Sequence, residues 1–159
     1  MRLALAQLRK LMLPYALEED LDLSEDLNGY EDILDSKPAH VSYNITMLET
    51  DKYLIHMEIN IELVLESAIS LKPIEKSIHA SSDEIYMQNP PLESDINPFD
   101  GQTLDTKEAV LTSVLCEKPM RSILDGEVFE SGEDVLNKEE DDEEKINPAF
   151  ASLADLLKK

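Results

Sequence analysis

Three histidines and a single cysteine are the side chains whose types could support metal binding or nucleophilic catalysis. His40, His56 and His79 are separated by 16 and 23 residues, and the pattern around them places them on different strands. Zinc sites usually draw ligands from shorter, regular spacings, so we expect three solvated imidazoles. Cys116 lies in a predicted helix beside Leu115, where we expect a buried structural thiol. We therefore predict neither a metal site nor a reactive cysteine.

Motifs that hold phosphate, calcium or a catalytic nucleophile are not formed by the other residues. With four glycines, the chain has no glycine-rich phosphate loop and no nucleophile elbow. The segment beginning at Asp95 resembles a calcium loop, but its fifth position is Phe99 and its glycine, Gly101, comes one residue late. No set of residues offers a nucleophile, a base and an orienting partner. The sequence predicts a non-enzyme without cofactor or small-molecule substrate.

The charge of the chain is strongly negative and unevenly distributed. The formal net charge is −21, of which residues 1–126 contribute −14, residues 127–144 contribute −9 and residues 145–159 contribute +2. A field of this sign repels phosphate backbones and anionic lipids and attracts basic partners. We therefore expect no generic binding of nucleic acid. The sparse cations that could contact it are Arg2, Arg9, Lys10, Lys72 and Lys76.

Composition also bounds the class and the compartment. The 159 residues fit one domain, and its core must be aliphatic because only 5% of residues are aromatic. One cysteine cannot form an internal disulfide, which favours a reducing compartment. No apolar run approaches the roughly 20 residues that cross a bilayer. We expect a cytoplasmic protein without a membrane segment.

The stretch from Tyr53 to Leu65 is the element around which the predicted fold is built. Apolar residues occupy its odd-numbered positions, and mostly polar residues occupy the even-numbered ones. This period of two is typical of a strand with one buried and one solvated face. Because typical strands have about 5–6 residues, we expect a bend or bulge near its C-terminal end. Residues 41–47 alternate similarly, and the short connection at 49–52 predicts an antiparallel hairpin.

Weaker patterns supply the other elements. We predict a short strand passing into a helical turn at 2–13, a strand at 17–23 and an acidic connection at 25–37 with a helical turn around Ile33. One or two strands are expected at 66–87, with Pro73 at an edge or bulge, and the proline-rich residues 88–103 predict a long loop. A helix is predicted at about 105–117, with Asp105 and Glu108 as its capping box and Pro119 as its stop.

These elements predict an α+β fold in which an antiparallel β-sheet is covered by one main helix, and a strongly curved or barrel-like sheet is one alternative. The domain comprises residues 1–126. Residues 127–145 are predicted to form an acidic disordered linker, because KEEDDEEK at 138–145 cannot pack. Residues 146–159 predict a short amphipathic helix, which is marginal alone and needs a surface to dock against.

The candidate partner-binding residues lie at this C-terminal end. The acidic run is either a solvated linker or a capture site for a basic partner, and the helix face can anchor in a groove. The candidates are Asn147, Pro148, Phe150, Leu153 and Leu157 in the helix and Glu139, Glu140, Asp141, Asp142, Glu143 and Glu144 in the acidic run.

Several segments, in their order and spacing, resemble the YceD family, whose members are named for accumulation of large-subunit (23S) ribosomal RNA. They are MRLALAQLRKL at the start, LDLS at 21–24, the paired strands at 40–65, LVLESAISLKPIE at 63–75, the helix ending in CEKPM at 116–120, and INPAFASLADLL at 146–157. The resemblance covers essentially the whole chain. The closing motif after an acidic spacer is its most specific part.

Two departures limit what the resemblance implies. Many relatives carry a C-x-x-C pair after the long strand, where this chain has Ser67 and Ser70. A serine hydroxyl is not a zinc ligand, so neither zinc nor a redox role is carried over. Relatives usually have Asp-Pro-Arg where this chain has Asn147, Pro148 and Ala149, which weakens any phosphate contact by this motif.

The resemblance implies a non-enzymatic ribosome-biogenesis factor that supports 23S rRNA accumulation or processing and large-subunit assembly. Its partners would be the large-subunit precursor, through a basic ribosomal protein and/or rRNA. The acidic charge favours a basic protein held by the acidic run and by docking of residues 146–158. An acidic protein–protein adaptor unrelated to ribosomes, binding through the same C-terminal motif, is the alternative. In a third interpretation, the C-terminal helix folds back on its own sheet.

Overall fold

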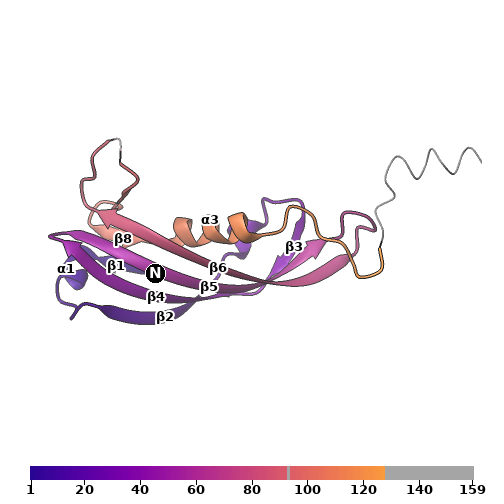
Figure 1. Cartoon of the computed structure of the whole chain (residues 1–159), viewed down its shortest axis with the longest axis horizontal. Helices are drawn as coiled ribbons and strands as arrows, with labels where there is room; N and C mark the ends of the chain where they lie inside the picture. Colours follow the sequence, from indigo (N-terminus) through magenta and orange to yellow (C-terminus); the bar gives the residue numbers. More distant parts are fainter. Residues whose placement is uncertain (93, 128–159) are drawn as a thin grey trace, which may run out of the picture. The chain divides into compact units, whose positions relative to one another are not determined.

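The strand β5, Lys52–Glu66, is the centre of the fold (Figure 1). Its odd-numbered residues from Tyr53 to Leu65 are all buried, and none is more than 3% exposed. Removal of apolar surface from water is the main favourable contribution to folding, so this face organises the strands beside it. The predicted strand of period two is confirmed.

A computed structural model describes residues 1–92 and 94–127, and Met1–Leu124 form one compact unit. Before β5 lie β1 (Arg2–Ala4), α1 (Leu5–Leu8), β2 (Tyr15–Leu21), α2 (Ser24–Leu27), β3 (Ile33–Ser36) and β4 (Ala39–Glu49). After β5 lie β6 (Pro73–Met87), β7 (Asn97–Pro98), β8 (Thr103–Asp105) and α3 (Lys107–Glu117).

The main sheet is open. Its strands follow the order β2-β4-β5-β6-β7, and β3 pairs with β5 outside this path. These pairings are antiparallel except for the short parallel contact of β6 with β7. Within the described residues the first and last strands of this order do not pair with each other, so the barrel-like alternative is wrong. The predicted hairpin of residues 40–65 is confirmed as β4 and β5.

The strand β6 runs without interruption beside β5. Fifteen residues of β6 pair one to one with β5 and show no register shift. The bulge predicted near the end of the long strand is therefore absent from this pairing, and the nearest irregularity lies in β3, between Ile33 and Asp35. Pro73 is the first residue of β6. Because proline has no N–H group, this terminal position avoids the loss of a hydrogen bond in the middle of the strand.

Two predicted connections contain more regular structure than the sequence indicated. The helical turn expected around Ile33 is wrong, because Ile33 begins β3 and is buried, while the turn of helix lies at α2. The predicted loop at 88–103 contains β7, and its last residue, Thr103, begins β8. The strand β8 pairs with β1, which with α1 confirms the predicted strand and helical turn near the start of the chain.

The helix α3 covers one face of the sheet, where it packs against β6 and β5. Val110 and Val114 form its buried side. Cys116 is exposed, so the predicted buried thiol is wrong. Its position two residues after Val114 turns it about 200° around the helix axis, away from the core. The predicted capping box does not form, because no side-chain cap is present and Asp105 instead accepts from the N–H of Lys107 at 3.0 Å.

A buried polar cluster joins the residues that immediately precede β1 and α3 to β4 and β2. The amino group of Met1 donates to the hydroxyl oxygens of Tyr43 at 3.0 Å and Thr106 at 2.9 Å, and it forms an ion pair with Glu19. Burial raises the pKa of the Tyr43 hydroxyl. Because a buried charge is costly unless it is paired and hydrogen-bonded, these partners hold the first strand in one place.

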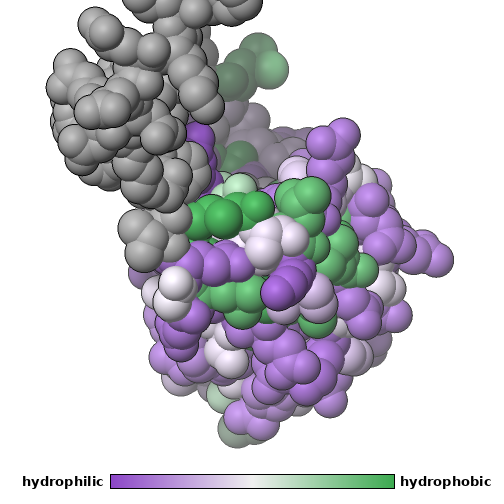
Figure 2. Space-filling view, turned by 90° about the vertical axis from the view of Figure 1, so that its right-hand side faces the viewer, coloured by the Kyte–Doolittle hydropathy of each residue, from purple (hydrophilic) through white to green (hydrophobic). Residues whose placement is uncertain are grey.

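One end of the unit, formed by β3, the β5–β6 connection and the segment after α3, exposes aliphatic side chains, and we call it the apolar end. Figure 2 shows hydrophobic residues gathered there. Leu34, Ile69, Leu71 and Ile123 are 46%, 39%, 68% and 43% exposed. A β-bridge between Ser67 and Ser122 brings the segment after α3 to this end. Exposed apolar patches of this kind suit contact with other proteins.

The alternation of β5 leads to a direct test of the fold. Ile59→Asp places a carboxylate in the core and is expected to lower the free energy of unfolding by more than about 3 kcal/mol, or to abolish the cooperative transition. Asn60→Asp introduces the same group one residue later on the solvated side, and its effect should stay within about 1 kcal/mol. Chemical denaturation of both variants measures the difference. Equal stabilities would show that the assigned inner face is incorrect.

Candidate functional site

The face of the sheet opposite α3 is polar, and we call it the open face. Side chains alternate across a strand, so the even-numbered residues of β5 and their partners in β4 and β6 all project from this side. Its members are His40, Ser42 and Asn44 of β4, His56, Glu58, Asn60 and Glu62 of β5, and Ser77, His79, Ser81 and Asp83 of β6. The open face therefore gathers the histidines that the sequence places far apart.

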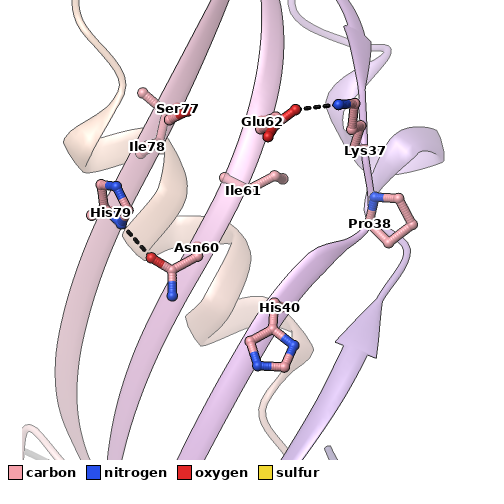
Figure 3. A pocket seen from close by; sticks show the side chains of 9 residues that line it. All are labelled: Lys37, Pro38, His40, Asn60, Ile61, Glu62, Ser77, Ile78 and His79. Carbon is pink, nitrogen blue, oxygen red and sulfur yellow. Dashed lines mark hydrogen bonds and ion pairs between the residues drawn. The ribbon is translucent and has the colours of Figure 1, made fainter.

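One row across the open face contains two of the three histidines. His40 and His79 are both register partners of Asn60. Figure 3 shows His79 hydrogen-bonded through Nδ1 to the side-chain oxygen of Asn60. His40 Nδ1 lies 2.9 Å from the carboxylate of Asp20, which belongs to β2. His40 Nε2 also lies 3.8 Å from the carboxylate of Glu18, and both imidazoles stay at the surface.

The third histidine occupies a second row. His56 Nδ1 lies 2.7 Å from the carboxylate of Asp83 on β6, and its Nε2 lies 3.7 Å from Glu58. The hydrogen bond with Asp83, with a smaller contribution from Glu58, raises the pKa of His56 above its usual value. The imidazole is 45% exposed. The prediction of solvated histidines on separate strands is confirmed for this side chain.

A cavity of about 280 Å³ opens on this face between the start of β4 and the neighbouring part of β6. Lys37 and Glu62 form an ion pair at its border, and His40, Asn60 and His79 contribute polar groups (Figure 3). These groups can donate and accept hydrogen bonds and can attract a cation. In the described part of the chain, no three His, Cys, Asp or Glu residues lie close enough to hold a metal ion.

The cations considered for nucleic-acid contact do not form one basic groove. Arg2 is bound to Asp100 at 3.4 Å and Arg9 to Asp51 at 2.5 Å. Both guanidinium groups are therefore already engaged by carboxylates. The three remaining candidates are divided between two places, since Lys10 follows α1, whereas Lys72 immediately precedes β6 and Lys76 lies near its start.

The corner after β5 is held by more than strand pairing and packing. Ser67 is fully buried, and its hydroxyl oxygen accepts from the N–H groups of Ile69 and Ser70 at 3.2 and 3.3 Å. The N–H of Ala68 donates to the carbonyl of Ser122 at 2.8 Å. Hydrogen bonds to Ser67 and Ser122 therefore add to the strand pairing and packing at this corner, and no sequence signal indicates Ser122.

The predicted partner-binding residues at 139–144 and 147–157 lie outside the described residues. The open face was not predicted as a site, because the sequence shows which residues alternate but not which residues of different strands share a row. The histidine positions within the alternating strands were the available signal.

Comparison with known proteins identifies one family. The family model described as large ribosomal RNA subunit accumulation protein YceD matches residues 55–157. The matched region begins within β5, includes β6 and α3, and covers more than half of the chain. No curated protein and no solved structure matches. A search of the described residues finds no helix that is long and apolar enough to span a membrane.

The contact between His56 and Asp83 predicts a titration that can be measured. The pKa of His56 is raised, so its contribution to stability is complete below the unfolded value of about 6.5 and is lost as the pH rises through the folded pKa. Asp83→Asn should lower the pKa of His56 toward that value in an NMR titration. Glu75→Gln, on the same strand and face but remote from His56, is the control. An unchanged pKa in Asp83→Asn would contradict the assigned contact.

Proposed function

The chain belongs to the YceD family of large ribosomal RNA subunit accumulation proteins, and we propose that it is a non-enzymatic factor for assembly of the large ribosomal subunit. The family description implies a role in accumulation of the large ribosomal RNA subunit, and it is the single observation that carries the proposal. The finer statement is that the protein supports 23S rRNA accumulation or processing in the cytoplasm by contacting the precursor particle.

The charge of the chain supports a protein as the direct contact. A duplex or a single strand of RNA is usually bound by a basic groove, with aromatic side chains for stacking in the second case. The net charge is −21, and the two arginines nearest the start of the chain are engaged by carboxylates. A basic ribosomal protein is complementary to such a surface.

The C-terminal end supplies the proposed contact. Residues 139–144 are all acidic, and we assign them to long-range attraction of the basic partner. Asn147 and Pro148 would begin a helix, and the anchoring side chains would be those of Phe150, Leu153 and Leu157. Attraction of this kind raises the association rate and weakens with salt. The exposed aliphatic residues of the apolar end are a further surface suited to protein contact.

A second candidate function is an acidic adaptor without a ribosomal role that binds through the same motif. Ala149 favours it, because this alanine stands where the resemblance to the YceD family implies an arginine. The two functions differ in what happens to ribosomes when the protein is missing.

A strain that lacks the protein is expected to accumulate less large subunit than the parent, because precursor maturation would slow. Sucrose-gradient profiles and the ratio of mature to precursor 23S rRNA measure this effect. Re-expression of the full chain should restore the profile. Unchanged large-subunit levels would remove the ribosomal assignment and favour the adaptor.

The role of the C-terminal end is tested by binding to purified large-subunit precursor particles. Deletion of residues 127–159 should abolish co-sedimentation at low salt. The triple variant Phe150→Ala, Leu153→Ala, Leu157→Ala should weaken it by about tenfold or more, because apolar anchors are lost. Lys159→Ala, outside the docking segment 146–158, is the control and should bind normally. Full co-sedimentation of the protein without residues 127–159 would contradict this mechanism.

A further inference from the structure

The strand β6 has one paired side and one open side. Its full length pairs with β5, whereas its other side pairs with β7 only at Tyr86 and Met87. Within residues 1–92 and 94–127, no backbone hydrogen bond reaches this second side between Ile74 and Ile85. The sheet therefore ends in a long edge strand.

The hydrogen bonds of β5 determine which residues of β6 face outward. The carbonyl of Glu62 accepts from Lys37 at 2.9 Å, and the N–H of Glu66 donates to Asp32 at 3.0 Å. Even-numbered residues of β5 thus direct their backbone groups away from β6, and odd-numbered residues direct theirs toward it. Residues in a hydrogen-bonded antiparallel pair face each other, so Ile61 bonds with Ile78, its register partner.

The odd-numbered residues of β6 consequently direct their N–H and C=O groups to the open side. The carbonyl of Met87, an odd-numbered residue, agrees with this assignment because it accepts from Phe99 of the β7 segment at 3.2 Å. The outward residues before the contact with β7 are Glu75, Ser77, His79, Ser81 and Asp83, all of which are exposed, followed by the half-buried Ile85.

Unpaired edges of this kind are templates for another strand, and addition of an extended peptide to a sheet edge is a common mode of recognition. We propose that the free edge of β6 binds an extended segment of a basic protein by β-strand addition. The identity of that protein as ribosomal rests on the proposed function, whereas the edge itself does not.

Charge selects the partner. The outward residues Glu75 and Asp83 carry carboxylates on the open face, and Glu58 and Glu62 lie beside them on β5. Asp83 and Glu58 contact His56 and Glu62 pairs with Lys37, so Glu75 is the carboxylate that contributes most to the attraction of a basic segment. A segment with Lys or Arg at alternate positions places opposite charges in neighbouring rows, which stabilises strand pairing. A second copy centred on His79 would set Glu75 against Asp83 of the other copy, and like charges directly opposite are destabilising.

The inner side of the added strand has a different environment. It would lie beside Ile78 and Ala80, which are 5% and 7% exposed, and these are flanked on the same face by the exposed Lys76 and the half-buried Ser82. Small or apolar side chains suit these neighbours. The expected ligand therefore alternates between basic and apolar residues. Each ligand residue would pair with one residue of β6, so the open part of the edge accommodates about ten ligand residues.

The test uses the full chain and a capped decapeptide of alternating Lys and Val. NMR titration should shift the amide signals of Ser77, His79 and Ser81. A peptide of alternating Glu and Val should bind much more weakly, because its charge is reversed. The Lys–Val peptide methylated at every backbone nitrogen keeps the charge but cannot donate to the edge, and it should lose binding.

Ser81→Pro removes an outward N–H without removing a bond to β5, and proline is tolerated at such edge positions. It should weaken peptide binding by about tenfold or more while retaining the melting transition. Ser81→Ala, which keeps the N–H, and Ala16→Pro, at an outward position of the opposite edge strand β2, should bind as the unchanged protein does. If Ser81→Pro fails to fold, Glu75→Lys supplies the second variant and should also weaken binding.

Four outcomes would overturn the proposal. They are equal binding by Ser81→Pro and the unchanged protein, equal binding of the methylated peptide, a dimer that Ser81→Pro dissociates, and peptide binding that appears only after removal of residues 128–159. The last two would assign the edge to a second copy or to the chain's own segment. The peptide experiment uses no ribosomal component. If the peptide does not bind, the sucrose-gradient test of the proposed function is unaffected. If the deletion strain has a normal gradient profile, the proposal for the edge of β6 is unaffected.

Discussion

Pairing of β5 on both sides is the constraint on which the rest of the structure depends. Its odd-numbered side chains are buried, which fixes the face that α3 covers and leaves the other face polar. The same alternation governs its backbone groups, since even-numbered residues bond toward β3 and β4 and odd-numbered residues bond toward β6. One period of two therefore determines the core, the open face and the direction of every outward amide in β6.

The parts of the fold that follow from local alternation could be predicted from the sequence. The long strand, the hairpin with β4 and a helix stopped near Pro119 are of this kind. The acidic surroundings of Ile33 predict a helical turn, because they hide a short strand that pairs only with the distant end of β5. The apolar neighbours of Cys116 predict a buried side chain, but the helical phase set by Val114 turns it outward.

The candidate site was harder to predict because it depends on register. Sequence separations of 16 and 23 residues concealed that His40 and His79 share a row with Asn60. The acidic charge, the apolar end and the engagement of two arginines by carboxylates support the proposed basic protein partner. This view agrees with a family named for accumulation of large-subunit RNA without requiring a basic RNA-binding groove.

The central claim is that β6, which is paired with β5 on one side, leaves its other side open for a partner strand. Amide hydrogen exchange of the free protein, followed residue by residue by NMR, tests it most directly. The account predicts slow exchange for Ile78, Ala80 and Ser82, whose amides bond to β5, and fast exchange for Ser77, His79 and Ser81, whose amides point outward. Slow exchange in both sets, or protection of the odd-numbered set alone, would contradict it.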